Sequence, residues 1–501
     1  MVSQSEKVIP WKANNYVFTI LNFFIHTIIL AVFIGLIIFV NAGSTENFLS
    51  YVTNVDNLKK LAYLLIFMLA LITILYLYLY WESRDFLMEI KNDTLIFLVL
   101  YLCLVLSFVL GNYVSVYARP IALGALLILL LVGKRTALFF NLIFAAMVFS
   151  IDVFTNQPFD ADAAAVSLVM TITVGVLAVY LIDGIGSRLV VLGMGLIIAI
   201  PMVILAVIVE LLSMSDYSTI VFVIIHAFTG GLSSVAVLML TLPVFEWLFN
   251  IVTNYRLAEI TDHRSKLLKK LSVEAPGTFD HSKVVASLAE SCAVAIGENP
   301  LLARAAAYYH DVGKLKQPQF FTENQHGFNP HDDITPELST QIIRSHTSDG
   351  YELIKKNKLP QIIADVAREH HGTLSIQYFY MKAQRYTDGE IDKDNFRYPG
   401  PKPRSKIAAI VMLADGCEAA VRAHNDRSRE KVENIVKTIF NDRMNEEQFS
   451  ECDITMRDID LLRNAIINAL SGVYHDRINY PKANKKFGDG FGGSADSNGK
   501  K

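Results

Sequence analysis

Long apolar runs dominate the first half of the chain and constrain its fold more than any other feature. A helix needs roughly 20 residues to cross the hydrocarbon core of a bilayer, and runs of about that length recur between short polar loops. Eight such runs lie at approximately 16–41, 59–81, 94–117, 119–133, 136–154, 163–185, 188–212 and 217–241. The fourth run is the weakest, because 120–132 is short and Lys134 and Arg135 interrupt the longer apolar stretch. The sequence therefore predicts a polytopic helical membrane domain of about eight spans.

Charge is distributed unevenly along the chain. Of its 93 charged side chains, 24 fall within residues 1–250 and 69 in the remainder, while 52% of all residues are hydrophobic. This contrast predicts a membrane-embedded first half joined to a water-soluble second half. The net charge of −3 argues against a nucleic-acid polymer as a partner. The four cysteines have no CxxC spacing, which favours free thiols in a reducing compartment.

The loop charges predict the orientation of the membrane domain. Basic residues lie on the side of the N-terminus, at Lys7, Lys12, Arg84, Lys91, Lys134, Arg135 and Arg188. The opposite loops carry Asp160, Asp162 and Asp216. By the positive-inside rule, both termini are expected in the cytoplasm. The first run lacks a small-residue cleavage site behind it, so we expect a retained anchor rather than a signal peptide.

Six ionisable residues fall within or near the predicted spans. They are His26, Asp152, Asp183, Glu210, His226 and Glu246. Charged groups inside a bilayer are costly and often mark a transport path. Several of these residues lie near span ends, where water is close, and a transporter is expected to show more of them in mid-span. A structural role is therefore favoured.

The second half has helical periodicity throughout. Residues 244–271 continue the pattern of the last span and predict a connector helix at the membrane face. Residues 272–478 place apolar side chains at i, i+3 and i+4 with little β-type alternation, which predicts a helical bundle. The Gly-, Ser- and Lys-rich tail at 479–501 is expected to be disordered. The fold class expected for the whole chain is all-α.

The chemistry is concentrated in a set of histidines and aspartates in this second half. Ten of the twelve histidines follow residue 262, and several lie beside an acid or another histidine. The candidate metal ligands are His281, His310, Asp311, His346, His370, His371 and Asp415. Imidazole and carboxylate without cysteine suit iron, manganese and zinc, and bundles build such sites from side chains on facing helices. Structural roles are favoured for His326, His331, His424 and His475, and His331-Asp332 is interpreted as an accidental second pair.

Residues 272–415 resemble the HD-domain phosphohydrolases, specifically the PgpH-type seven-transmembrane HD proteins that hydrolyse cyclic di-AMP. The matching segments are APGTFDHS (275–282), AIGENPLLARAAAYYHDVGK (295–314), FTENQHGFNPHD (321–332), RSHTSDG (344–350), REHHGT (368–373) and MLADGCEAA (412–420). The resemblance implies that the seven residues are ligands of a two-metal site bridged by Asp311. Family members usually have a large extracellular domain after the first span, where this chain has only about 17 residues, 41–57.

The resemblance also implies a domain plan and a reaction. We expect an anchor span with a short external loop at 1–58, a seven-helix membrane domain at 59–243, the connector at 244–271 and an HD domain at 272–478. The protein would lie in a bacterial cell membrane, with the HD domain in the cytoplasm, and it could form a homodimer. Two divalent ions, iron or manganese with zinc possible, would support hydrolysis of cyclic di-AMP to pApA.

Four further residues are candidates for substrate binding. Lys314, one turn beyond His310, is a candidate for holding a phosphate oxygen, with a solvated helix-end lysine as the alternative. Tyr308, Tyr309 and Tyr378 are candidates for stacking on adenine, although aromatic residues in bundles are more often core. Three alternative functions stay open: hydrolysis of another cyclic dinucleotide, a receptor whose HD module binds nucleotide without cutting it, and, more weakly, a transporter with a regulatory domain.

Overall fold

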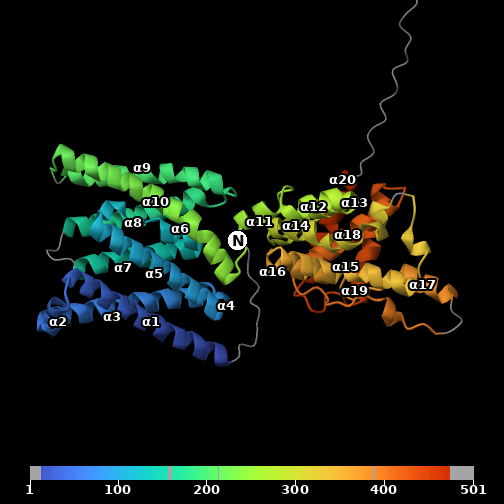
Figure 1. The fold of residues 1–501 in the computed structure, drawn as a ribbon, viewed down its shortest axis with the longest axis horizontal. Helices are drawn as coiled ribbons and strands as arrows, with labels where there is room; N and C mark the ends of the chain where they lie inside the picture. Colours follow the sequence, from blue (N-terminus) through green and yellow to red (C-terminus); the bar gives the residue numbers. More distant parts are fainter. Residues whose placement is uncertain (1–12, 156–160, 213, 326, 387–389, 474–501) are drawn as a thin grey trace, which may run out of the picture.

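The computed structural model describes residues 13–155, 161–212, 214–325, 327–386 and 390–473. Within these ranges the chain forms helices, and its only β-type pairing is one isolated bridge between Ser375 and Arg397. The all-α fold class expected from the periodicity is therefore confirmed. Figure 1 shows two parts side by side, the membrane helices α1 to α10 and a second bundle built from α11 to α20.

Seven helices in the described ranges are long and apolar enough to cross a membrane. They are α1 (Ala13–Ala42), α3 (Val55–Glu82), α5 (Ile90–Tyr113), α7 (Lys134–Thr155), α8 (Ala161–Ile182), α9 (Arg188–Leu212) and α10 (Tyr217–Phe249). Two short helices, α2 (Thr45–Thr53) and α4 (Arg84–Leu87), lie in the loops between them. This arrangement is that of a multi-pass membrane protein.

The fourth apolar run forms a helix too short to span a bilayer by itself. A 3-10 turn at Val116–Ala118 leads into α6 (Leu123–Leu131), which has nine residues. Eight of these nine residues are buried, and α6 packs against α7, α8 and α10. The eight expected runs therefore correspond to seven long helices and one short helix enclosed among them.

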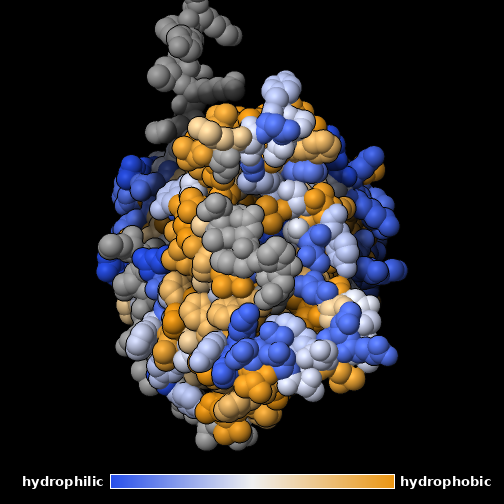
Figure 2. Space-filling view, turned by 90° about the vertical axis from the view of Figure 1, so that its left-hand side faces the viewer, coloured by the Kyte–Doolittle hydropathy of each residue, from blue (hydrophilic) through white to orange (hydrophobic). Residues whose placement is uncertain are grey.

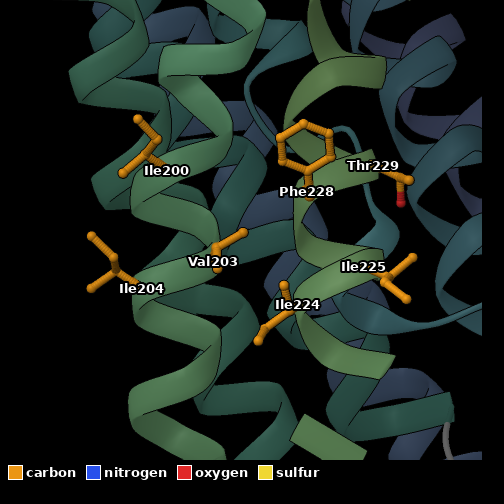
Figure 3. A pocket seen from close by; sticks show the side chains of 7 residues that line it. All are labelled: Ile200, Val203, Ile204, Ile224, Ile225, Phe228 and Thr229. Carbon is orange, nitrogen blue, oxygen red and sulfur yellow. The ribbon is translucent and has the colours of Figure 1, made fainter. Parts of the chain in front are cut away.

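The outer faces of the membrane helices carry large exposed apolar side chains. On α9, Leu189, Leu196 and Ile200 are each more than half exposed. Figure 2, viewed from the membrane-helix end, shows apolar side chains spread over much of the surface. A groove of about 460 Å³ between α9 and α10 is lined by aliphatic and aromatic side chains and by one polar residue, Thr229 (Figure 3). Such surfaces are stable in contact with lipid chains rather than water.

Several charged side chains inside the membrane part are paired. The guanidinium of Arg119 lies 2.6 Å from the carboxylate of Asp152, and both side chains are buried. Removing one partner of such a pair typically costs about 3–5 kcal/mol, because the other charge is left buried and alone. Glu210 accepts a hydrogen bond of 2.7 Å from Tyr117, and Lys134 pairs with Asp183. These contacts fit the structural role favoured by the sequence.

The chain leaves the membrane through a broken segment, so the prediction of one connector helix over 244–271 is wrong. Helix α10 ends at Phe249, where Asn250 adopts a left-handed conformation with φ of 52°. Asparagine tolerates this conformation and commonly ends helices. Thr253 then caps α11 (Asn254–Ile260) by accepting a hydrogen bond from the backbone N–H of Arg256, and α12 (Lys266–Glu274) follows after a second turn.

Eight helices form the remainder of the second bundle in the described ranges. They are α13 (Pro276–Ile296), α14 (Pro300–Tyr309), α15 (Pro336–Lys356), α16 (Gln361–Glu369), α17 (Gln377–Tyr386), α18 (Lys406–Ala423), α19 (Arg429–Asn445) and α20 (Met456–Val473). Three of them begin with proline at the first turn, which suits a position whose N–H has no intrahelical partner. Helix α18 lies in the core, with twelve of its residues buried. The tail predicted at 479–501 falls outside the described residues.

Candidate metal centre

The seven predicted ligands come from five separate helices or their ends. His281 lies on α13, His346 on α15 and Asp415 on α18. His310 ends α14, with Asp311 directly after it, and His370 ends α16, with His371 directly after it. All except His371 are buried. The structure therefore brings together residues that are up to 134 positions apart in sequence.

The ligand atoms gather into two groups. Asp311, His346, His370 and His371 form one group, and His281, His310 and Asp415 form the other. Within each group, the candidate ligand atoms lie within 4.8 Å of one another. This spacing is one that a single metal ion can bridge, because metal to nitrogen or oxygen bonds are close to 2 Å long. The described residues thus contain two adjacent clusters that can each hold a metal ion.

Asp311 lies between the two clusters. Its Oδ1 atom is 3.3 Å from Nε2 of His346 and 3.7 Å from Nε2 of His370. Its Oδ2 atom is 3.2 Å from Nε2 of His310 and 3.7 Å from Nε2 of His281. Each carboxylate oxygen therefore faces a different pair of imidazoles.

Hydrogen bonds on the far side of the imidazoles fix their orientation. The Nδ1 atoms of His310, His346 and His370 lie 2.7, 2.5 and 2.9 Å from the carbonyl oxygens of Ala307, Ile343 and Ala367. Each of these carbonyls is three residues earlier in the chain. An N–H donated from Nδ1 leaves the Nε2 lone pair facing the centre, which is how metal-binding histidines are usually held.

Glycine allows the His310-Asp311 segment to approach α15 closely. After Asp311 the chain makes a 3-10 turn, Val312–Lys316, that packs against this helix. A Cβ at Gly313 would clash with the carbonyl oxygen of His346 and with the backbone nitrogen of Gly350. The glycine thus keeps Asp311 within reach of His346.

The donor set fits divalent metal ions. His310 Nε2 and Asp311 Oδ1 are buried, and neither has a hydrogen-bond partner among the described residues. Leaving a buried polar atom unsatisfied usually costs about 1–3 kcal/mol, so such atoms call for a ligand. Neutral imidazoles and carboxylates that point at one place, without cysteine, suit iron, manganese or zinc.

The two groups differ in their electrostatics. Burial lowers the pKa of His346 to about 3 and holds that of His371 well below its usual range. Burial also opposes the charge on His310, but the neighbouring carboxylate of Asp311 outweighs it and raises the pKa of His310 to about 10. His281 behaves likewise, since its hydrogen bonds to Asp415 and Glu418 overcome burial and raise its pKa.

Lys314 lies inside the site and not in solvent. Its Nζ atom is 2.7 Å from Asp311 Oδ2 and 2.8 Å from Oε1 of Glu323, and its side chain is 13% exposed. Burial disfavours its charge, but the two carboxylates outweigh this effect and raise the pKa of the ammonium. Lys314 lies three residues after Asp311, in the 3-10 turn that follows this residue and not in a continuation of α14.

Two of the predicted adenine-stacking tyrosines are core residues, so this part of the prediction is wrong. Tyr309 is fully buried, and its hydroxyl donates to the carbonyl of Ile260 at 2.7 Å. Tyr308 is also buried, with its hydroxyl 3.0 Å from Nε2 of His263. A base cannot stack on rings enclosed in this way. Tyr378 lies on α17, is 62% exposed, and has Phe379 as its ring neighbour.

Three residues beside the site escaped the sequence analysis. Glu418 lies 2.5 Å from Nδ1 of His281, and Glu323 holds Lys314. Tyr398 stacks on the ring of His371, with centroids 4.3 Å apart and planes 25° apart. Glu418 carried a usable signal, because it follows Asp415 by three residues on the same predicted helix. Glu323 and Tyr398 lie in irregular segments whose position depends on the tertiary fold.

The other histidines of the bundle do not join the centre. His331 is buried and lies 2.9 Å from the carbonyl oxygen of Phe320, and Asp332 beside it pairs weakly with Lys382. His424 is exposed at the end of α18. His326 and His475 lie outside the described residues.

Two family models match the chain. A model described as a 7TM receptor with intracellular HD hydrolase matches residues 58–253, and one described as an HD domain matches residues 278–420. The second match includes all seven predicted ligands.

Relatives with assigned names match over most of this chain. The cyclic-di-AMP phosphodiesterase PgpH of Bacillus subtilis is 37% identical over 422 residues, which cover 81% of this chain and 58% of that protein. The protein of the same name from Listeria monocytogenes is 36% identical, covering 84% and 59%. The chain thus spans somewhat less than two thirds of these relatives. The solved HD domain of L. monocytogenes PgpH with cyclic di-AMP is 48% identical, covering 43% of this chain and 99% of the solved one, with a TM-score of 0.41.

Proposed function

We propose that the chain belongs to the family of seven-transmembrane receptors with an intracellular HD hydrolase domain and that it is a metal-dependent phosphodiesterase that hydrolyses cyclic di-AMP to pApA. One observation carries the proposal. Seven residues of the required types lie in two adjacent groups, with Asp311 between them. A module that only bound nucleotide would not need to keep a complete ligand set. The names of the relatives, which match over about four fifths of this chain, support the choice of substrate.

The two groups would each hold one divalent ion, iron or manganese in the first instance and zinc as a third option. Asp311 would contact both ions, since its two oxygens face different imidazole pairs. Such ions lower the pKa of a water molecule towards neutrality and neutralise phosphate oxygens. The imidazoles of His310, His346 and His370 would be held in a fixed orientation by backbone carbonyls next to their Nδ1 atoms.

Lys314 and Tyr398 would orient the phosphodiester. Lys314 carries the one ammonium group that ion-pairs with a predicted ligand in the described part of the chain, so it is placed to bind a non-bridging phosphate oxygen. The hydroxyl of Tyr398 makes no hydrogen bond to the described residues. Its ring stacks on His371. The hydroxyl would donate to a phosphate or ribose oxygen. Tyr378, exposed on α17, stays a candidate for contact with a base.

The membrane half would anchor this site on the cytoplasmic face. Arg188 pairs with Glu246 near the end of α10, where the chain continues into the second bundle, and Lys134 pairs with Asp183 shortly before α9. Basic residues at this end are what the positive-inside rule expects for cytoplasmic loops. We propose the domain plan expected from the sequence, with the anchor span at 1–58, the membrane domain at 59–243 and the HD domain at 272–478. Only the connector between them differs, because it is broken into separate helices.

A turnover assay on the full chain tests this function. Protein in lipid nanodiscs, stripped of metal and reloaded with iron, manganese or zinc, is supplied with cyclic di-AMP and, separately, cyclic di-GMP. We expect pApA from cyclic di-AMP with iron or manganese and much slower cleavage of cyclic di-GMP. Binding of cyclic di-AMP without any product under all three metals would contradict the enzyme and favour a receptor.

A further inference from the structure

A cavity separate from the metal centre lies where the membrane helices meet the second bundle. Its volume is about 560 Å³. It is lined from the membrane side by Arg188, Glu246 and Trp247, from α11 by Arg256 and Glu259, and from the loop after α15 by Lys358. Three parts of the chain that are distant in sequence thus meet around one space, and the proposed reaction uses none of these residues.

The charges around this cavity favour an anion. Three cationic side chains face two carboxylates. Arg188 forms ion pairs with both carboxylates, at 3.1 Å from Glu246 and 2.7 Å from Glu259. Arg256 is left with a long contact of 3.8 Å to Glu259. Lys358 has no carboxylate within salt-bridge distance in the described part of the chain, so one positive charge is unmatched.

Arg256 contacts the backbone of Lys358, and both residues line the cavity. Arg256 donates a hydrogen bond, 3.5 Å long, to the backbone carbonyl of Lys358. Lys358 has a φ of 55°, a left-handed conformation that a lysine rarely adopts, and its side chain is exposed. Leu359 and Pro360 form an apolar wall beside these two cations. Two cations next to an apolar surface form a surface suited to an amphipathic anion.

Two residues at helix ends indicate that the cavity lies near the bilayer surface. Trp247, near the end of α10, is 81% exposed, and Arg188 is the first residue of α9. Tryptophan and arginine at helix ends are typical of the membrane–water interface. Lipid phosphates lie at this level, so an anion held in the cavity would come from the membrane itself.

We propose that this cavity binds the phosphate headgroup of an anionic membrane phospholipid. Arg256 and Lys358 would bind the phosphate oxygens, Trp247 would lie against the glycerol region, and Leu359 with Pro360 would cover the apolar side. A lipid held in this way would contact the last membrane helix and the catalytic bundle at the same time. The inference does not depend on the reaction proposed for the metal centre.

Lipid binding by the full chain tests the proposal. Detergent-solubilised protein is titrated with phosphatidylglycerol, phosphatidylcholine and inorganic phosphate, and bound lipid is counted by native mass spectrometry. We expect retention of phosphatidylglycerol over phosphatidylcholine. The double variant R256Q/K358Q should weaken this retention about 30-fold, since each cation near a membrane surface contributes roughly fivefold. The matched control, K269Q/K270Q, removes two exposed lysines of α12 outside the cavity and should bind like the parent.

The outcomes separate the sources of the anion. Equal retention by R256Q/K358Q and by K269Q/K270Q would overturn the proposal. Inorganic phosphate that competes as well as phosphatidylglycerol would overturn the assignment to lipid. The single variant K358Q guards against misfolding, because Lys358 is exposed and makes no ion pair among the described residues. It should keep the parent's helical content and lose about fivefold in retention.

Discussion

His281 and Glu418 form a hydrogen bond of 2.5 Å between Nδ1 and Oε2 on the side of the imidazole that faces away from the proposed ions. The carboxylate fixes the tautomer of the ring and makes Nε2 a stronger ligand for a metal ion. Loss of such a partner typically costs 10- to 100-fold in metal affinity. We therefore expect Glu418→Gln to lower affinity for Mn²⁺ by about that factor, measured by titration calorimetry. Glu433→Gln, which changes an exposed carboxylate on α19, is the control; equal affinities in the two variants would show that Glu418 has no such role.

Lys314 should affect turnover more than metal content. It neutralises Asp311 and Glu323 and is the candidate for binding a phosphate oxygen. Removing one preorganised donor of this kind usually costs roughly 100- to 1000-fold in kcat. Lys314→Met should show this loss while keeping most of its metal, measured by turnover and elemental analysis of the same sample. Lys316→Met is the control, because that lysine pairs with Asp349 at the surface. Full activity in Lys314→Met would remove the residue from the site.

Tyr398 and Tyr308 provide a matched pair of hydroxyl deletions. Tyr398→Phe keeps the ring stacked on His371 but removes the proposed substrate contact. We expect kcat/KM to fall about fivefold with metal content unchanged, since one hydrogen bond contributes about 1 kcal/mol. Tyr308→Phe loses its bond to His263 and should lower the free energy of unfolding by a similar amount without changing kcat/KM. The reverse pattern would restore Tyr308 as a substrate-binding residue.

Metal binding should depend on pH differently at the two groups. In the metal-free protein His310 and His281 have raised pKa values, and that of His310 is about 10, so His310 holds a proton at neutral pH that an ion must displace. His346 and His371 have lowered pKa values and are already neutral. Affinity for the ion held by His281, His310 and Asp415 therefore rises with pH. Affinity for the ion held by the group of His346 and His371 changes little.

Stoichiometry gives the test of this pH dependence. As the pH is lowered from 8 to 6, the group of His281, His310 and Asp415 should lose its ion first, so that bound manganese falls from about two per chain towards one. Calorimetry in buffers of different ionisation enthalpy should detect proton release for one of the two ions. Loss of both ions at the same pH would contradict the assignment.

The candidate ligands could be predicted from the sequence because each one lies in a helix or directly after one, in a run with a recognisable neighbour. His310-Asp311 and His370-His371 are adjacent pairs, and periodicity alone places them at helix ends. Tyr398 could not be found in this way, because its contact with His371 depends on an irregular segment that folds back from Phe396. The break after Phe249 was missed for a similar reason. The apolar periodicity continues through it, and a single Asn250 in a left-handed conformation ends the helix.

The variant Asp311→Ala tests whether Asp311 joins two ions in one site. Metal content and cyclic di-AMP turnover should be measured on one preparation of full-length protein, with helical content checked by circular dichroism and His424→Ala as the exposed-residue control. We expect Asp311→Ala to keep its helices, bind less metal and form no detectable pApA, while His424→Ala behaves as the parent. Near-normal turnover in Asp311→Ala would contradict the two-metal site.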